Sequence, residues 1–390
     1  MDGDLIYGYS RRIENELEKI DQRVGERNRE VLLRFYRHMV AEGLSKARIW
    51  KCLSTLRRLA ELLGKPFEEA TKDDIVELIA KIERRNYAEW AKHDYKVILR
   101  KFYKWLRGTD DYPPEVRWIR VKYSIPSRLR KKDLLTVEEI RRMADCAENV
   151  RDKAFIWVYF DSMRRLGEIL SLRIGDVEFD DLGAKLYVRG KVGPDQARIT
   201  FSVPLLLAWL SVHPFRDDPE APLWVTLDSR EKPKPLGYRC VHRMIVKCAK
   251  KAGIGKRVWP YLIRHSRITP ASKVLPHSLL CAAAGWKQGS RMPSVYIHLA
   301  GEDVDEAHLV LDGVSKPERR EEQPKARVCP RCRASNPPGS KFCGRCGAAL
   351  DLRTAMELDR LRARLDKLLD RLTEDPERLE KLVSLIESID

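Results

Sequence analysis

The sequence has no apolar run that approaches the roughly 20 residues needed to cross a lipid bilayer. Its first residues, MDGDLIYGYSRRIENELEK, lack a basic start followed by an apolar core, so we expect no secretory signal peptide. The nine cysteines come without any sign of secretion, which predicts reduced thiols inside a cell. These absences argue against a membrane-embedded or secreted protein and predict a cytoplasmic one.

Positive charge is in excess throughout most of the chain. The 390 residues include 75 Lys and Arg against 58 Asp and Glu, which gives a formal net charge of +17. The basic residues are scattered and do not form one tail, as expected for a protein that lies along a phosphate backbone. Solubility or an acidic partner would explain the same excess equally well. The length allows two or three domains, each with its own core.

Residues 10–110 predict a helical domain. Apolar residues recur at spacings of three and four in segments 31–44, 47–64, 73–82 and 89–108. Gly43, Gly64 and Gly108 stand where these helices should end, and Thr71 with Asp74 forms a helix start signal. The basic polar faces of these helices indicate either a solvated surface or a clamp on DNA.

Residues 111–133 are broken by prolines and rich in basic residues, which predicts a linker between two domains. We interpret Arg128, Arg130, Lys131 and Lys132 as candidate contacts to DNA phosphates. A charged, solvated loop is the alternative.

Residues 134–315 predict a second domain that is mostly helical. Thr136 and Glu139 form a capping box, and helical periodicity continues from there to about residue 177. Alternation around three glycines between residues 177 and 203 predicts a short antiparallel sheet. Helical patterns return over 237–253 and up to 313, with breaks expected at Pro270, Pro276 and Pro293. The predicted fold class is therefore mainly α with a small antiparallel β-sheet, or α+β.

Four separated motifs carry the functional signal. They are SMRRLGE with Arg165, GKVG with Lys191, PYLIRHSRIT with Arg264, and AAAGW followed by SVYIHL, which contain Trp286 and Tyr296. Lys191 follows Arg165 by 26 residues, Arg264 comes 73 residues later, Trp286 after 22 more and Tyr296 after another 10. This order and spacing resemble the tyrosine recombinase or phage integrase family, especially its archaeal branch.

The chemistry of such a site is the cutting and rejoining of DNA. A tyrosine can hold a phosphate covalently, and no metal or catalytic cofactor is needed if arginines carry the negative charge. The planar fork of arginine donates paired hydrogen bonds to two phosphate oxygens. The resemblance implies that Tyr296 is the nucleophile, that Arg165 and Arg264 clamp the phosphate, and that Lys191 protonates the departing 5′ oxygen.

The sequence departs from the family pattern at two positions. Met163 stands where glycine is usual, which leaves Arg164 as the alternative clamp to Arg165. Tyr261 stands where the family has histidine, three residues before Arg264. A tyrosine hydroxyl can donate to a phosphate oxygen but cannot exchange protons at neutral pH as imidazole does. We therefore expect Tyr261 to position the phosphate, and it is the rival candidate for the nucleophile.

Three further residues have supporting roles in this interpretation. Glu168 is expected to orient Arg165 by an ion pair, and His265 to pack behind the site. The Trp286 indole can donate to the phosphate and support the tyrosine helix, or simply fill the core. For the general acid, Arg189 and Arg198 compete with Lys191 because they lie in the same predicted hairpin.

A second module follows a charged linker at residues 316–326. Within residues 327–350, Cys329 and Cys332 form one CxxC pair, and Cys343 and Cys346 form another ten residues on. Four thiolates at this spacing predict a zinc ribbon, because so short a segment has little core without a metal. Disulfides or an iron site are the alternatives. Its basic residues lean towards DNA: Arg331, Arg333, Lys341 and Arg345.

Residues 351–390 form a helical tail in this interpretation. Leucines three and four residues apart predict a coiled-coil-like seam, which could pack within the chain or mediate self-association. A second helix is expected after Pro376. The leucines of the seam are Leu358, Leu361, Leu365, Leu368 and Leu372.

The resemblance implies a site-specific DNA recombinase or integrase that works through a 3′-phosphotyrosyl intermediate. Its expected partners are double-stranded DNA attachment sites and further copies of itself, from dimer to tetramer, with no membrane. The expected setting is the integration or excision of a viral or plasmid element in an archaeal host. A type IB topoisomerase-like activity, chromosome dimer resolution and a noncatalytic DNA-binding regulator are the alternatives.

Overall fold

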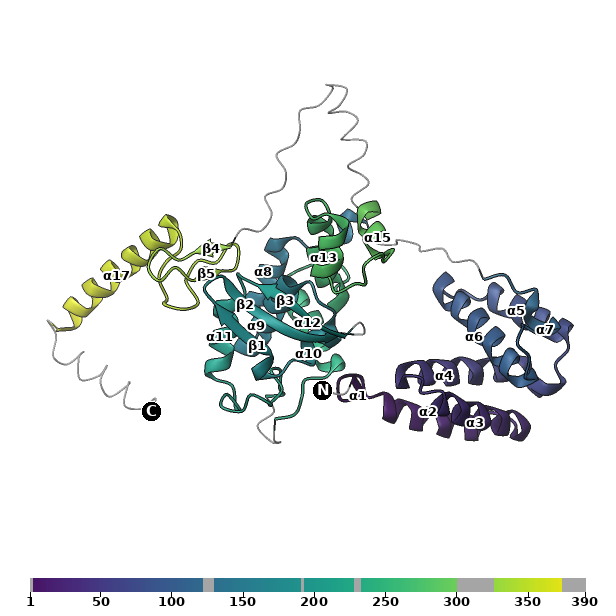
Figure 1. Ribbon diagram of the computed structural model, residues 1–390. Helices are drawn as coiled ribbons and strands as arrows, with labels where there is room; N and C mark the ends of the chain where they lie inside the picture. The colour runs from purple at the N-terminus through teal and green to yellow at the C-terminus, as the bar shows by residue number, and fades with distance from the viewer. Residues whose placement is uncertain (1–2, 122–129, 191–192, 228–232, 300–325, 374–390) are drawn as a thin grey trace, which may run out of the picture. The chain divides into compact units, whose positions relative to one another are not determined.

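The computed structural model describes residues 3–121, 130–190, 193–227, 233–299 and 326–373. The chain forms two compact units, Met1–Pro126 and Ser127–Asp390 (Figure 1). The boundary between the units lies within the basic segment 111–133. None of the helices in the described ranges is long and apolar enough to cross a membrane.

The first unit consists of helices, as the periodicity predicted. Its core includes Phe102, whose ring meets those of Phe67 and Phe35 edge-on at centroid distances of 4.8 and 5.3 Å. Arg57 is buried and its Nε donates to Glu16 at 2.5 Å. The helices are α1 (Gly3–Tyr7), α2 (Tyr9–Arg23), α3 (Glu26–Ala41), α4 (Lys46–Leu63), α5 (Lys72–Arg84), α6 (Glu89–Arg107) and α7 (Pro114–Arg117).

The predicted helix boundaries in this unit are confirmed. Thr71 caps α5, and Thr71 and Asp74 exchange both hydrogen bonds of the capping box. Gly64 and Gly108 end α4 and α6 in the left-handed conformation that favours glycine. Val116 and Ile119, which belong to the predicted linker, are buried in this core. The first part of that segment therefore packs with the helices and is not free chain.

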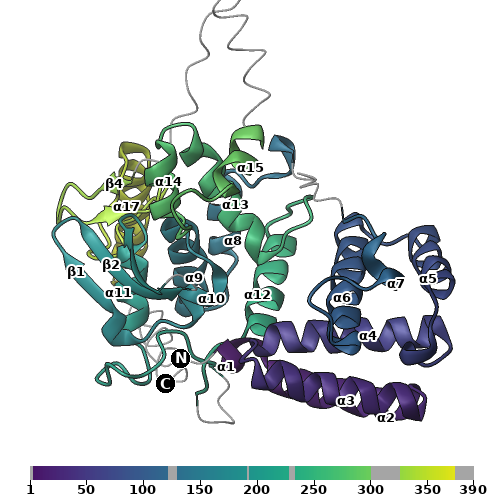
Figure 2. The ribbon, with the colours of Figure 1, turned by 45° about the vertical axis from the view of Figure 1, so that its right-hand side comes forward.

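The second unit is built around α9 (Val150–Ser162), whose residues from Ala154 to Ser162 are all buried. Helix α9 contacts α8, α11 and α13 (Figure 2). The capping box of Thr136 and Glu139 begins α8, as predicted. The other helices are α8 (Val137–Asp145), α10 (Leu166–Leu170), α11 (Val203–Ser211), α12 (Tyr238–Lys251), α13 (Pro260–Ser272), α14 (His277–Ala283) and α15 (Met292–Leu299).

The predicted antiparallel sheet is present and consists of β1 (Val177–Asp180), β2 (Gly183–Gly190) and β3 (Gly193–Ile199). Strand β2 lies in the middle, and its alternate residues Ala184, Leu186 and Val188 are buried. Gly190 pairs with Gly193 at the end of the β2–β3 hairpin. This alternation fixes the register, because a shift by one residue would expose the apolar side chains.

Two expectations about helix continuity were wrong. The helical pattern does not continue through residues 163–165, because Met163 adopts φ 54° and ends α9; the chain then forms short α10 and a 3-10 turn at Ile174–Asp176. Pro270 does not break α13, which runs on to Ser272. Pro270 lacks the N–H that would bond to the carbonyl of Ser266, and the helix ends two residues later. Pro293 lies in the first turn of α15, where a missing N–H is tolerated.

The module at the C-terminal end has two short antiparallel strands, β4 (Arg327–Val328) and β5 (Ser335–Asn336), followed by α17 (Leu352–Thr373). Helix α17 exposes part of the predicted leucine seam, since Leu361 and Leu365 are 61% and 56% exposed. The side chains of Leu368 and Leu372 and all of residues 374–390 lie outside the described residues.

Candidate active site

Arg165 lies at the break between α9 and α10. Its backbone N–H and its Nη1 both donate to the carboxylate of Glu168, at 3.0 and 2.7 Å, so the expected ion pair is present. The same Nη1 donates to the carbonyl oxygen of Gly285 at 2.8 Å. Glu168 is buried, and the Arg165 side chain is 28% exposed. The buried carboxylate therefore holds the guanidinium in place, and solvent can still reach it.

Arg264, on α13, is almost completely buried. Its Nη2 donates to the carbonyl oxygen of Ala284 at 2.9 Å. Its Nε and Nη1 have no hydrogen-bond partner among the described residues. Ala284 and Gly285 are adjacent, so one short stretch after α14 binds both Arg264 and Arg165. The two arginines, 99 positions apart in the sequence, thus share one anchor.

Tyr296, on α15, packs into the same place. It is 1% exposed, and its ring centroid lies 5.3 Å from that of Trp286 and 5.4 Å from that of His265. The guanidinium carbon of Arg264 lies 5.7 Å from the Trp286 ring centroid. Trp286 is itself 8% exposed and belongs to a small apolar cluster with Tyr296. The indole of Trp286 therefore packs against the ring of Tyr296.

Burial raises the pKa of Tyr296 to about 12, and the nearby Arg264 and Arg165 guanidinium groups oppose this rise. The hydroxyl is therefore protonated at neutral pH in the free protein. Burial also lowers the pKa of His265 to about 4, and the positive charge of Arg264 acts in the same direction. His265 is consequently neutral at pH 7, which fits a side chain packed behind the site.

Tyr261 begins the same helix as Arg264 and differs from Tyr296 in its exposure. It is 40% exposed, and the Arg264 guanidinium carbon lies 5.8 Å from its ring centroid. Its ring also lies 5.5 Å from that of His265. An exposed phenol beside a buried arginine can donate to an anion that reaches the arginine from solvent. The rings of Tyr261 and Tyr296 are thus both neighbours of the His265 ring.

Lys191 lies outside the described residues. Gly190 and Gly193, which lie on either side of it in the sequence, pair with each other. A Cβ atom on Gly190 would lie 3.1 Å from Oε1 of Glu168. The end of this hairpin therefore lies directly against the ion pair of Arg165 and Glu168. The competing Arg198 is ion-paired with Asp180 at 2.6 Å.

Arg164 has a structural connection that sequence reasoning missed. It is 1% exposed, forms an ion pair with Asp195 and donates to the backbone oxygen of Gln196, both on β3. Gly285 leaves no room for a Cβ because the Arg164 guanidinium lies against it, and its φ is 64°. Arg164 thus connects the hairpin to the stretch that anchors the two candidate clamps. No feature of the sequence other than its position next to Arg165 indicated these contacts of Arg164.

Three of the four basic residues predicted to contact DNA from the linker lie within the described residues. Arg128 lies outside the described residues. Lys131 and Lys132 are exposed in a single 3-10 turn, and Arg130 contacts Asp133 at 3.4 Å. This exposure is compatible with both predictions for these residues, contacts to DNA phosphates and a charged, solvated loop.

The four cysteines of the C-terminal module come together as predicted. Their sulfur atoms all lie within 4.8 Å of one another, with Cys329 and Cys346 at 3.6 Å and Cys332 and Cys343 at 3.5 Å. Four thiolates around zinc at about 2.3 Å would have sulfurs roughly 3.8 Å apart, so the set fits a tetrahedral ion. All four are free cysteines, not disulfides. Backbone N–H groups of Cys332 and Arg345 donate to two of the sulfurs, which favours the thiolate form.

The other five cysteines lie apart from this set and form no disulfide. Cys52, Cys248 and Cys281 are buried, and burial raises the pKa of each of these thiols. They are core side chains.

Comparison with known proteins agrees with this geometry. The model of the phage integrase family matches residues 133–302, and that of the zinc-ribbon domain matches residues 328–350. Tyrosine recombinase XerA of Pyrococcus horikoshii is 27% identical over 245 residues, which cover 62% of this chain and 79% of that protein. Tyrosine recombinase Synpcc7942_B2651 of Synechococcus elongatus is 33% identical over 129 residues, or 39% of its length.

Solved structures share the fold. The XerH site-specific recombinase in its post-cleavage complex matches 79% of this chain and 96% of its own, with a TM-score of 0.56 and 16% identity. A lambda integrase (75-356) dimer bound to a COC' core site matches 68% of this chain and 94% of its own, with a TM-score of 0.54 and 16% identity. At these identities the likeness concerns the architecture alone, and roles of individual residues depend on the geometry above.

Proposed function

Because the chain belongs to the phage integrase family of tyrosine recombinases, we propose that Tyr296 attacks a DNA phosphodiester that Arg165 and Arg264 hold. The observation that supports this most is the anchoring of both arginines by Ala284 and Gly285, beside a buried tyrosine. Charged donors fixed before the substrate arrives stabilise the developing negative charge without having to reorganise.

In the proposed reaction the Tyr296 hydroxyl gives its proton to solvent water, and its oxygen forms a bond to phosphorus as the bond from phosphorus to the 5′ oxygen breaks. The DNA strand is then joined to the enzyme through a 3′-phosphotyrosyl bond. Arg264 contributes its free Nε and Nη1, and Arg165 its accessible guanidinium, to the phosphate oxygens. A phosphate bound between the two arginines also accepts hydrogen bonds from Nε and Nη1 of Arg264, which have no partner among the described residues.

The departing 5′ oxygen needs a proton, and we assign that proton to Lys191. The supporting observation is the position of Gly190, which precedes Lys191 and lies against Glu168. In the reverse step a free 5′ hydroxyl from a partner strand attacks the phosphotyrosyl bond and returns the proton to the lysine. Tyr261 takes the place of the usual histidine as a hydrogen-bond donor to the phosphate.

Double-stranded DNA sites and further copies of the chain are the proposed partners, in a cytoplasmic setting. Two solved relatives of the same fold are a lambda integrase dimer bound to a core site and a lambda integrase tetramer bound to a Holliday junction. The net charge of +17 supports binding to a phosphate backbone. Integration or excision of a viral or plasmid element in an archaeal host is the biological setting that we infer.

We assign the chain six functional segments in this proposal. The helical clamp occupies residues 10–110, the basic linker 111–133 and the recombinase domain 134–315. A short linker at 316–326 leads to the zinc ribbon at 327–350 and the helical tail at 351–390. Zinc has a structural role in the ribbon, and the arginines and Lys191 perform the chemistry.

A nicked DNA substrate that traps the covalent intermediate tests the proposal. The assay contains a chelator that removes free metal ions and leaves the zinc of the ribbon in place. Under these conditions the wild-type protein should form a covalent protein–DNA adduct. Tyr296→Phe should form none. Tyr261→Phe is the matched control, because it removes the other hydroxyl of the group and should still give an adduct. An adduct that persists in Tyr296→Phe would assign the nucleophile to another residue. Absence of any adduct in the wild type would favour a noncatalytic DNA-binding regulator.

A further inference from the structure

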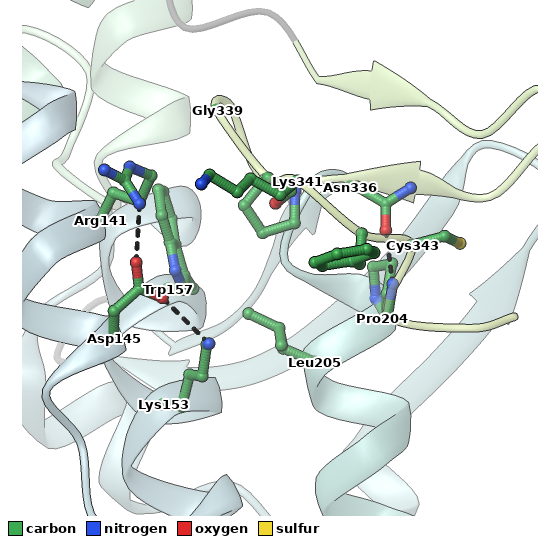
Figure 3. A pocket seen from close by; sticks show the side chains of 14 residues that line it. Arg141, Asp145, Lys153, Trp157, Pro204, Leu205, Asn336, Gly339, Lys341 and Cys343 are labelled. Carbon is green, nitrogen blue, oxygen red and sulfur yellow. Dashed lines mark hydrogen bonds and ion pairs between the residues drawn. The ribbon is translucent and has the colours of Figure 1, made fainter. Parts of the chain in front are cut away.

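The zinc ribbon lies against the recombinase domain, within the second compact unit. Strand β5 contacts α11, and a shallow pocket lies between the two modules (Figure 3). From the recombinase domain the pocket is lined by Arg141, Lys153, Trp157 and Leu205, among others. From the ribbon it is lined by the segment Asn336–Gly344. None of the candidate active-site residues that the structure describes lines it.

Two glycines let the ribbon approach closely. A Cβ atom on Gly344 would lie 2.9 Å from the Cβ of Pro204, at the start of α11, which is shorter than a normal contact. A Cβ on Gly339 would lie 3.1 Å from Cδ of Arg141, on α8. Gly344 directly follows the predicted zinc ligand Cys343, so this close contact lies next to the metal site.

The ribbon segment that faces α11 is also ordered from within. The side chain of Asn336 is completely buried, accepts from the N–H of Gly344 at 2.9 Å and donates to the backbone oxygen of Ala334 at 2.9 Å. Asn336 therefore links β5 to the second pair of cysteines. Zinc bound to those cysteines would hold the ribbon surface that contacts α11 in a single conformation.

The recombinase side of the contact is connected to the active site. Trp157 lines the pocket and belongs to α9, where it packs edge-on against Phe201 at a centroid distance of 5.7 Å. Helix α9 ends at Ser162, and Arg165 follows three residues later. On α8, Arg141 pairs with Asp145, which also accepts from Lys153 on α9 at 3.0 Å (Figure 3). The ribbon thus packs against α9, which ends shortly before Arg165, and against α8, which is bonded to α9 through Asp145.

We propose that the zinc ribbon is an intramolecular brace: when zinc folds it, it docks on the surface formed by Arg141, Trp157, Pro204 and Leu205 and stabilises α8, α9 and α11. The partner of this surface is the ribbon of the same chain. A ribbon of this size depends on its metal for folding, so zinc binding and the stability of the recombinase domain are coupled.

Hydrogen exchange of the full chain, with zinc bound and after its removal by a strong chelator, tests the brace. Loss of zinc should increase amide exchange in α8 and α11 by about tenfold or more, in addition to unfolding the ribbon itself. If exchange in α8 and α11 stays unchanged while the ribbon loses protection, the ribbon is not a brace. Protection of α11 that disappears on dilution would instead place the ribbon on a second copy and overturn the intramolecular assignment.

A matched pair of variants on α11 separates docking from zinc binding. Leu205→Glu puts a carboxylate into the contact and should retain zinc, give fast exchange in α11, and show no further change on chelation. Leu207→Glu is the control, because Leu207 is 40% exposed on the same helix and does not line the pocket. It should behave like the wild type. Equal exchange in the two variants would contradict the proposed docking surface.

Discussion

Arg164 and Arg165 are consecutive in the sequence, yet each forms an ion pair with a different element: Arg164 with Asp195 on β3, and Arg165 with Glu168 on α10. Arg164 is buried and ties down the hairpin, whereas the Arg165 side chain keeps 28% of its surface exposed. The sequence could not separate these two roles, because either arginine matches the motif. The structure favours Arg165 as the residue that can reach a phosphate.

The two arginines should therefore respond differently to the same substitution. Arg165→Lys should reduce the rate of covalent adduct formation by roughly 100-fold or more, because lysine cannot supply the paired donors. Its free energy of unfolding should change little. Arg164→Lys should lower the free energy of unfolding by about 2 kcal/mol or more, because it leaves Asp195 and the Gln196 carbonyl poorly paired. Urea unfolding beside single-turnover cleavage measures both, and the reverse pattern would make Arg164 the clamp.

Tyr261 should act through its hydroxyl. Tyr261→Phe should slow cleavage by roughly 10-fold to 100-fold, the range expected for one hydrogen bond to a charged group. Tyr261→His should give a cleavage rate that depends on pH around 6.5, because an imidazole at this exposed position titrates there and a phenol does not. Rate profiles between pH 5.5 and 7.5 check this. A wild-type profile with the same inflection would show that the titrating group is elsewhere.

The role of Lys191 can be tested through the leaving group. Lys191→Ala should cleave normal DNA slowly, because the departing 5′ oxygen receives no proton. A substrate in which sulfur replaces that oxygen should be cleaved by Lys191→Ala nearly as fast as by the wild type, since a thiolate leaves without a proton. Arg198→Ala is the control and should cleave both substrates like the wild type. If sulfur rescues Arg198→Ala and not Lys191→Ala, the general acid is Arg198.

Met163 occupies a left-handed backbone conformation that costs a non-glycine residue about 1–2 kcal/mol. Its side chain also packs against the cluster that contains Tyr296. Met163→Ala removes the packing and keeps the strain, while Met163→Gly removes both. We expect the glycine variant to be more stable than the alanine variant by about 1 kcal/mol, the reverse of the usual order. Urea unfolding of the two variants decides, and a more stable alanine variant would mean that the conformation is not strained.

His265 should make the protein less stable in mild acid. Its pKa in the folded state is lowered to about 4, so between pH 6.5 and 4 the unfolded chain binds a proton that the folded protein does not. Stability is therefore present above pH 6.5 and is lost as the pH falls, by up to about 3 kcal/mol. His265→Gln should flatten this loss, while His213, whose pKa burial also lowers, remains in both proteins. An unchanged slope between pH 7 and 5 in His265→Gln would contradict the assignment.

Much of the fold could be predicted because local signals are strong. The capping boxes at Thr71 and Thr136 and the glycines 64 and 108 mark helix ends through chemistry that acts within four residues. The hairpin was visible for the same reason, since its alternation is local. The break at Met163 was missed because only tertiary packing holds a methionine in that conformation.

The site was less predictable from the sequence than the fold. Motif spacing predicted Arg165, Arg264 and Tyr296 as site residues, and the structure places these three side chains close together. The shared anchor at Ala284 and Gly285 could not be foreseen, because it consists of backbone oxygens that carry no sequence signal. The docking of the ribbon was missed for a similar reason: Gly344 and Pro204 are 140 residues apart and neither suggests a contact by itself.

The two unpaired nitrogens of Arg264 have a consequence for the protein when no DNA is bound. A buried donor without an acceptor destabilises the folded state, by about 1–3 kcal/mol for a neutral group and more for a charged one. An anion bound at Arg264 should therefore stabilise the folded protein. If Arg264 binds the DNA phosphate as proposed, the contact that recognises the backbone also gives these two buried donors their acceptors.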